Sequence, residues 1–263
     1  MKIKIVKETI IKVLKKPKLK NPVLLVGLPG IGNVGRLAVG YLVSHLKAKK
    51  FAELYSPHFF NFVVIHENKI HMLRNEFYYW KNKKGNDLIM LIGDAQSSNA
   101  PGHYEIAGKI VEFVAKLGCK EIITIGGFGT GRIEEEPEIY GVPTDESIKR
   151  KYQKYGINFS VSGRIGTIIG AAGIIPGIAK LYNIPSMALL GETPGFPIVT
   201  DPNAAEAVLK ILEKMLKIKV DLSQLHEKVE EMHEFVKRID ELQREALEEM
   251  KKKKKQEELK YIG

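Results

Sequence analysis

Two glycine-rich segments have the spacing that phosphate-binding loops use. Residues 30–35 (GIGNVG) match the G-x-G-x-x-G pattern between an apolar run and a helical pattern. In dinucleotide-binding proteins such glycines allow a tight turn and bring backbone N–H groups to a pyrophosphate. Glu53 follows about 20 residues on, where an acid would meet a ribose, but residues 49–54 (KKFAEL) do not have the composition of a strand. Cofactor binding therefore stands beside the alternative that these glycines serve only close packing.

The second glycine-rich segment, residues 126–132 (GGFGTGR), nearly meets the P-loop pattern. Arg132-Ile133 stands where that pattern has the Lys-Ser/Thr pair that holds phosphate and magnesium. Phosphate hydrolysis is therefore not indicated. We expect a mobile or interface loop at the carboxyl end of the strands.

Three polar residues follow a buried-strand pattern at residues 88–92 (LIMLI). Asp94, Gln96 and His103 stand where α/β enzymes place active groups. An aspartate at a strand end more commonly caps a loop or a helix. Catalysis is thus one hypothesis for this cluster, and a structural role is the other.

The remaining candidates favour structural roles. Cys119 is the sole cysteine and has no paired histidine, so it excludes a disulfide framework and is expected to be inert. His226, Glu230 and His233 share one helix face and could hold a metal, but their positions are typical of exposed residues beside a helical seam. Glu134-Glu135-Glu136 indicates a solvated loop. We predict no catalytic residues, no cofactor and no metal.

The elements that must position these residues alternate along the chain. Short apolar runs, hydrophobic on both faces, alternate with amphipathic helical patterns from Val23 to about Leu190. This alternation predicts an α/β fold with an open, mostly parallel sheet flanked by helices. Residues 67–69 indicate a hairpin turn between two strands, and Asp201-Pro202 begins a helix that should run to about Lys217.

An apolar stretch from Ile165 to Ala179 is too short to span a membrane. It contains four glycines and a proline, and it predicts a buried strand, a turn and a helix. No other stretch is as long. We expect a soluble cytoplasmic protein with no membrane partner.

The net charge of +10 is concentrated at one end. Residues 1–20 carry eight lysines and one glutamate, whereas residues 221–263 carry ten basic and twelve acidic residues. Residues 2–7 (KIKIVK) alternate lysine with aliphatic residues, which predicts an edge strand rather than a secretory signal. Nucleic-acid binding would rest on the charge alone, since no reading module accompanies it. We expect no nucleic-acid partner.

The pattern changes near residue 220. Leucine, valine, methionine and isoleucine then recur with spacings of 3, 4, 3, 4 and 3, at Leu222, Leu225, Val229, Met232, Val236 and Ile239. This heptad seam predicts a long helix over residues 221–255 that packs on another chain or on its own domain. The chain thus divides into an α/β body, residues 1–220, and a charged helical extension with a tail, residues 221–263.

Six short motifs recur together in a fixed order. They are VGLPGIGNVG (26–35), LIGDAQ (91–96), IGGFGTG (125–131), IGAAGIIPG (169–177), ALLGETPG (188–195) and DPNAAEAVL (201–209). The series resembles the proteasome assembly chaperone family, specifically the archaeal homologues of the second assembly chaperone. The resemblance covers about residues 20–220 and the helical extension.

The resemblance implies a fold like that of the nucleoside phosphorylases without their catalytic set. It also implies a homo-oligomer that binds the α-subunits of the core proteasome without ATP, as an assembly chaperone or an activator. Activators of this kind commonly end in a hydrophobic residue, a tyrosine and one further residue, which insert between α-subunits. This chain ends Leu259-Lys260-Tyr261-Ile262-Gly263, with the tyrosine third from the end. Leu259, Tyr261, Ile262 and Gly263 are the candidate partner-binding residues.

A second hypothesis of a different class also stands. The glycine-rich segments and Asp94 could serve a nucleotide- or nucleoside-binding α/β enzyme. The missing strand for Glu53 and the incomplete catalytic set distinguish the two hypotheses in favour of a non-catalytic protein.

Overall fold

The computed structural model describes residues 7–132, 134–195, 200–223, 225, 238, 241–242, 244–249 and 251–252. Its strands are β1 (Ile10–Val13), β2 (Val23–Gly27), β3 (Lys49–Tyr55), β4 (Val63–His66), β5 (Lys69–Met72), β6 (Asn75–Trp80), β7 (Leu88–Gly93), β8 (Glu121–Gly129), β9 (Ile139–Pro143) and β10 (Ser186–Thr193). Its helices are α1 (Val34–His45), α2 (Ala100–Lys116), α3 (Glu146–Tyr152), α4 (Ala171–Leu181) and α5 (Pro202–Leu216), with single 3-10 turns at Ile31–Asn33 and Gln153–Tyr155.

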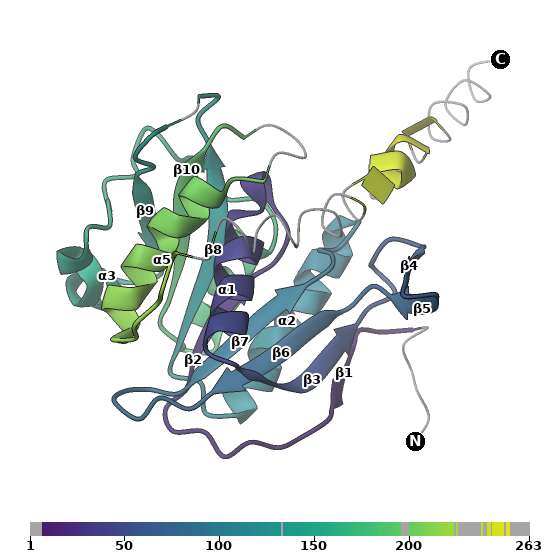
Figure 1. Cartoon of the computed structure of the whole chain (residues 1–263), viewed down its shortest axis with the longest axis horizontal. Helices are drawn as coiled ribbons and strands as arrows, with labels where there is room; N and C mark the ends of the chain where they lie inside the picture. The colour runs from purple at the N-terminus through teal and green to yellow at the C-terminus, as the bar shows by residue number, and fades with distance from the viewer. Residues whose placement is uncertain are drawn as a thin grey trace.

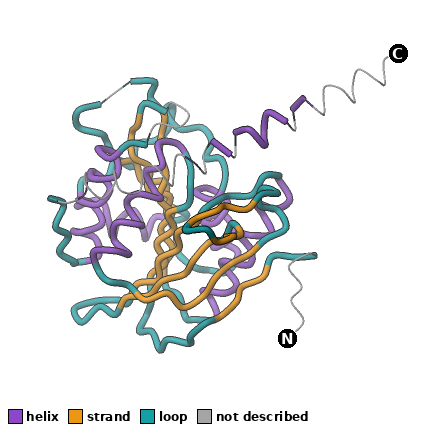
Figure 2. The backbone as a smooth tube through the Cα atoms, turned by 45° about the vertical axis from the view of Figure 1, so that its right-hand side comes forward, coloured by secondary structure: helices purple, strands orange, loops and turns teal. Residues whose placement is uncertain are grey.

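The main sheet has eight strands in the order β1-β3-β6-β7-β2-β8-β10-β9 (Figures 1 and 2). The four central strands β7, β2, β8 and β10 run parallel. Strands β1, β3 and β6 on one side, and β9 on the other, pair antiparallel. The α/β class and the flanking helices are therefore confirmed, while the sheet as a whole is mixed because antiparallel strands extend its parallel centre at both edges.

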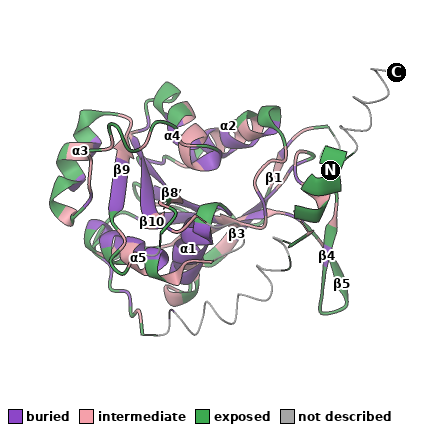
Figure 3. Ribbon diagram, turned by 90° about the horizontal axis from the view of Figure 1, so that it is seen from above, coloured by how far each residue is buried: buried purple, intermediate pink, exposed green. Residues whose placement is uncertain are grey.

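Helices cover the parallel centre on both faces. Contacts join α1 to α5 on one face and α2 to α4 on the other, and the view from above shows the strands between these two helical layers (Figure 3). Strand β2 is buried at every position. Val23 and Leu25 pack into the core under α1 and α5, whereas Leu24 and Val26 pack into the core under α2 and α4. A run that is apolar at each residue is what a strand between two helical layers requires.

Helix α1 lies against the sheet with backbone touching backbone. A Cβ atom on Gly35, in the first turn of α1, would lie 2.2 Å from the carbonyl oxygen of Ile125 in β8. A Cβ atom on Gly27, at the end of β2, would lie 2.2 Å from the carbonyl oxygen of Gly35. Heavy atoms cannot approach this closely, so both positions require glycine.

The structure corrects three sequence-based expectations. Residues 49–54 do form a strand, β3, because its charged residues pair with those of β6 while Phe51 and Leu54 enter the core. The segment beginning at Gly126 is a strand as far as Gly129, since it pairs in register with β10. The apolar stretch beginning at Ile165 contributes helix α4 but no strand.

The predicted hairpin turn and the predicted start of the last body helix are both confirmed. The hairpin β4–β5 turns through Glu67 and Asn68, whose φ angles of 49° and 58° are those of a type I′ turn. The side chain of Asp201 accepts a hydrogen bond from the backbone N–H of Ala204 at the start of α5, with Pro202 at the first helical position. These signals depend on neighbours in sequence, which is why they could be predicted.

The helical extension is described only in part. Leu222 packs against the core under α1 and α5, and Leu225 is fully buried within it. Residues 244–249 are helical. The rest of the predicted seam lies outside the described residues, as does the lysine-rich edge strand predicted at residues 2–7. The edge strand that the structure describes is β1, which pairs antiparallel with β3.

The hairpin β4–β5 presents an aliphatic face to solvent. Cross-strand pairing places Val63 opposite Met72 and Ile65 opposite Ile70. All four side chains are exposed, by 44% to 74%, while Val64 between them is buried. Among the described residues, no helix is long and apolar enough to cross a membrane.

We predict that Gly35→Ala lowers the free energy of unfolding by about 3 kcal/mol or more, because the added methyl group meets the Ile125 carbonyl. Gly108→Ala is the matched control, since a Cβ atom there meets nothing within 4 Å in the middle of α2. That variant should gain about 0.5–1 kcal/mol from its better helix propensity. Urea unfolding measures both, and equal stability of the two variants would contradict the close crossing of α1.

Candidate functional site

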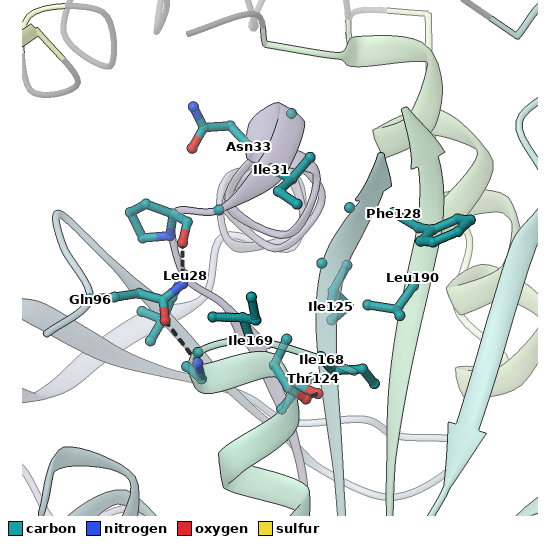
Figure 4. A pocket seen from close by; sticks show the side chains of 18 of the residues that line it. Leu28, Ile31, Asn33, Gln96, Thr124, Ile125, Phe128, Ile168, Ile169 and Leu190 are labelled. Atoms are coloured by element: carbon teal, nitrogen blue, oxygen red, sulfur yellow. Dashed lines mark hydrogen bonds between the residues drawn. The ribbon is translucent and has the colours of Figure 1, made fainter. Parts of the chain in front are cut away.

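A cavity of about 670 Å³ opens at the carboxyl ends of the parallel strands. Its walls come mainly from three segments: residues 28–33 after β2, residues 124–129 of β8, and residues 165 and 167–172 before and at the start of α4 (Figure 4). Strand β2 continues into α1 on one face of the sheet, while its neighbour β7 continues into α2 on the other. Such a change of face opens a crevice at the carboxyl ends of parallel strands, where α/β proteins bind ligands.

The walls of the cavity are mainly apolar. Their side chains include Leu28, Ile31, Ile125, Phe128, Ile168, Ile169 and Leu190. Among the described lining residues, Arg244 is the one permanent charge, and none is a lysine, an aspartate or a glutamate. Phosphate groups are commonly held by cationic side chains in addition to backbone N–H groups, and a ribose commonly by an acid. The described walls therefore suit an aliphatic or aromatic group better than a nucleotide.

Gln96 joins two of the walls. Its side-chain amide nitrogen donates to the carbonyl oxygen of Pro29, and its amide oxygen accepts from the backbone N–H of Ala171 at 2.8 Å. The dashed lines of Figure 4 show both bonds. The first ties the loop after β2, and the second satisfies a backbone donor at the start of α4. Gln96 thus holds the cavity open by fixing its two sides.

The glycines around the cavity serve packing. A Cβ atom on Gly127 would lie 2.3 Å from the carbonyl oxygen of Ile31, so the short helical turn after β2 rests directly on β8. Gly32, with φ of 62°, faces Thr193. Of the three motif glycines, Gly30 alone has no atom closer than 3.8 Å to its Cβ position. The packing interpretation of the G-x-G-x-x-G motif accounts for Gly32 and Gly35.

The three polar residues after β7, Asp94, Gln96 and His103, do not all lie at the same site in the structure. Gln96 and His103 line the cavity, whereas Asp94 accepts a hydrogen bond from the backbone N–H of Arg74 and lies 4.0 Å from the guanidinium of Arg36. Burial raises the pKa of Asp94 above its ordinary value, against the opposing effect of these two partners. Asp94 therefore anchors a loop.

His103 lies in the cavity wall near the start of α2. Burial lowers the pKa of its imidazole, which favours the neutral form of the ring. A neutral imidazole adds a polar group to the wall without adding charge. His103 also lines a second, narrow cleft together with further residues of α2 and α4.

Glu53 belongs to a separate polar cluster on the β3–β6 part of the sheet. It lies 3.0 Å from the ammonium of Lys50, which also contacts Glu76 at 2.9 Å, and Arg74 contacts Glu76 at 2.8 Å. Burial alone would raise the pKa of Glu53, but hydrogen bonds from Lys50 and Tyr55 hold it below its ordinary value. The Glu53 carboxylate is thus paired within this cluster. It does not line the cavity, so it does not play the role of a ribose-binding acid there.

Other predicted residues take structural positions or lie outside the described part of the chain. Cys119 is buried, and burial raises the pKa of its thiol to about 11, which makes it unreactive as expected. The glutamates at 134–136 are half-buried or exposed. Within the described residues no cluster of histidine, cysteine and acidic side chains could hold a metal. Residues 226, 230 and 233 and the tail residues 259–263 lie outside the described residues.

The sequence patterns did not predict the wall formed by residues 165–169. Ile169 is 89% exposed although it stands in the longest apolar stretch of the chain. Phe60, from the loop between β3 and β4, also lines the cavity. The available signal was the aliphatic pair Ile168-Ile169, which stands directly before a glycine at a helix start.

Comparison with known proteins gives one consistent result. Residues 24–240 match the model of the PAC2 family. An uncharacterized protein of Methanocaldococcus jannaschii is 37% identical over 247 residues, which is 93% of either chain. Among solved structures, Pyrococcus furiosus PbaB, an archaeal proteasome activator, is 40% identical with a TM-score of 0.80, covering 89% of this chain and 99% of that one. Pyrococcus furiosus PbaA, an archaeal homologue of proteasome-assembly chaperone, is 28% identical with a TM-score of 0.74, covering 90% and 99%.

We predict that Gln96→Ala lowers the free energy of unfolding by about 2 kcal/mol, because it leaves the Pro29 carbonyl and the Ala171 N–H without their partner. Gln96→Glu keeps an acceptor for Ala171 but loses the donor to Pro29, so it should also be destabilised. Ser97→Ala is the control, since its hydroxyl bonds at an exposed turn. Urea unfolding that finds all three variants equal would contradict the bridging role.

Proposed function

The chain belongs to the PAC2 family, and from this membership we propose that it is a non-catalytic, ATP-independent proteasome assembly chaperone or activator. We propose that it acts as a homo-oligomer in the cytoplasm and binds the α-subunits of the core proteasome. The observation that carries the proposal is the similarity, over nearly the whole of both chains, to an archaeal proteasome activator. The family itself is one of proteasome assembly chaperones and activators.

The cavity supports the non-catalytic part of the proposal. Its described walls lack the acidic and lysine side chains with which enzymes of this fold class move protons and hold phosphate. Asp94, the one acid that the sequence placed near it, is committed to Arg74 and Arg36. We propose that the body keeps the layout of a nucleoside phosphorylase without its catalytic set. The described walls favour this interpretation over a nucleotide-dependent enzyme.

The carboxyl-terminal extension is the proposed contact with the proteasome. In this proposal the body comprises residues 1–220 and the extension residues 221–263. Leu259, Tyr261, Ile262 and Gly263 would supply apolar groups and a terminal carboxylate to a site between α-subunits. A tyrosine anchor combines a large apolar surface with a hydroxyl that can bond at the pocket floor.

The aliphatic face of the hairpin β4–β5 supports self-association. Val63, Ile65, Ile70 and Met72 form an uncharged patch, which matches a second copy of itself without unpaired charge. A contact in which the same patch meets itself about a two-fold axis is the commonest arrangement in homo-oligomers. We propose that this face is buried between subunits.

We predict that removing residues 259–263 weakens binding to purified α-subunits by at least about tenfold, because the anchoring side chains and the terminal carboxylate are lost together. Tyr261→Ala should reproduce most of the loss, and Lys260→Ala should not. A pull-down followed by titration measures the effect. Failure of the full-length protein to bind would overturn the proposed function, whereas unchanged binding of the truncated protein would exclude residues 259–263 as the contact.

We predict that Ile65→Asp shifts the protein to a smaller species in sedimentation velocity, since it places a charge in the centre of the aliphatic face. The dissociation constant of the assembly should rise by about tenfold or more. Lys69→Asp, in the same hairpin beside the turn, is the control and should leave the mass unchanged. A wild-type monomer would overturn self-association, and an unchanged mass for Ile65→Asp would exclude this face as the contact.

A further inference from the structure

Neither packing nor backbone conformation requires a glycine at the first position of the G-x-G-x-x-G motif. A Cβ atom on Gly30 would meet one atom within 4 Å, the side-chain nitrogen of Gln96 at 3.8 Å. The φ angle of Gly30 is −175°, which is extended backbone that any residue adopts. Gly32 and Gly35 thus have a structural explanation, and Gly30 does not.

Gly30 lines the cavity at the carboxyl ends of the parallel strands. The residue is exposed, and a side chain there would stand beside the Gln96 amide at the opening of the cavity. The cavity volume of about 670 Å³ lies within the range of roughly 300–1,000 Å³ that is typical of small-molecule sites. A glycine at position 30 therefore keeps a cavity of ligand size accessible.

The cavity presents aliphatic surface to water. Ile31 and Ile169 line it, and they are 51% and 89% exposed with residues 244–249 of the extension in place. Figure 4 shows both side chains among those that surround the cavity. Removing such surface from water is the main source of affinity for an apolar ligand.

Two polar side chains at the cavity could recognise a polar group on such a ligand. Within the described part of the chain, no hydrogen bond or ion pair engages the ring of His103 or the guanidinium of Arg244. Arg244 is exposed, and it carries the one permanent charge of the described lining. A charge on the ligand is therefore matched when it is negative.

The single guanidinium favours a carboxylate over a phosphate. A carboxylate carries one negative charge and accepts two parallel N–H bonds from arginine. A phosphate monoester carries about 1.5 to 2 negative charges at pH 7, which one exposed arginine does not neutralise. The described walls contain no acidic side chain that would repel a carboxylate.

We propose that the cavity binds a small carboxylic acid with an aliphatic or aromatic body, whose carboxylate pairs with Arg244. The apolar body lies between the turn after β2 and the segment before α4, against Ile31 and Ile169. His103 offers it a hydrogen-bonding group in the wall, and Gly30 leaves the opening clear. This site goes beyond the proposed function, because an assembly chaperone or activator needs no small molecule.

Isothermal titration calorimetry of the full-length protein with hexanoate, octanoate and decanoate tests the site. The affinity should rise by about fourfold for each added CH₂ group that is buried. Binding should also show a negative change in heat capacity. A protein that does not bind decanoate at millimolar concentration, or that binds the three acids equally, would overturn the proposal.

Gly30→Leu places a side chain at the opening and should weaken octanoate binding by about tenfold or more. Gly166→Leu is the matched control, since Gly166 stands between two lining residues without lining the cavity itself, and a Cβ atom there meets nothing within 4 Å. Both variants should unfold at the same urea concentration. Equal affinity of the two folded variants for octanoate would contradict the site.

Arg244→Gln tests the charge of the ligand independently of Gly30. It should weaken octanoate binding by about threefold to fivefold, the effect of an exposed ion pair, and should leave the binding of 1-octanol unchanged. Arg238→Gln is the control, because Arg238 is an exposed arginine of the extension that does not line the cavity. An unchanged affinity for octanoate, or an equal loss for the alcohol, would overturn the assignment of a carboxylate.

Two further measurements exclude other binding surfaces. Ile65→Asp changes the aliphatic face of the hairpin β4–β5 and should bind octanoate like the wild type; a loss there would assign the binding to the hairpin. Gly30→Leu should keep the wild-type mass in sedimentation velocity, and a smaller mass would assign the cavity to a contact between copies. Either result would overturn the proposal. These experiments contain no proteasome, so their outcome is distinct from that of the α-subunit pull-down.

Discussion

Helix α1 crosses β2 and β8 so closely that backbone atoms, rather than side chains, form the contact. Gly27, Gly35 and Gly127 are the positions where a single methyl group would meet a carbonyl oxygen. Close contact of this kind lets the apolar faces of α1 and the sheet exclude water along the whole helix. It also sets the position of the turn after β2, and through that turn the shape of the cavity. The cavity is thus a consequence of how α1 packs.

Polar contacts hold the loops around the cavity that the glycine contacts do not position. Gln96 connects the turn after β2 to the start of α4, and Asp94 holds the chain before β6 through Arg74. Both side chains come from the few residues after β7, so one short segment coordinates three loops around the cavity. Buried polar groups that bond to backbone in this way restrict the loops to one arrangement. The result is a mainly apolar cavity whose surrounding loops are tied together by hydrogen bonds from side chains to the backbone.

The sequence predicted those features that depend on neighbouring residues. The apolar runs of β2, β7 and β8, the cap at Asp201 and the turn after His66 all carry local signals, and each was found in the structure. Strand β3 was not predicted, because its pairing with β6, which includes the ion pair Lys50–Glu76, joins two segments that no local pattern connects. The cavity could be expected only in part. The motif positions indicated the carboxyl ends of the strands, whereas the wall around Ile169 and the contribution of Leu247 depend on segments that are brought together only by the fold.

The glycine contacts have a further consequence for how such sequences are interpreted. Any chain that keeps this helix crossing must keep a residue without a side chain at Gly35, and the positive φ and the nearby Thr193 side chain require glycine at Gly32, whether or not a ligand is present. In this chain the G-x-G-x-x-G pattern therefore follows from the packing of α1 and the turn before it against the sheet. A search that counts the motif alone would place this chain among nucleotide-binding proteins. The Ile125 carbonyl oxygen that faces Gly35 and the Thr193 side chain that faces Gly32 are what tell the two cases apart.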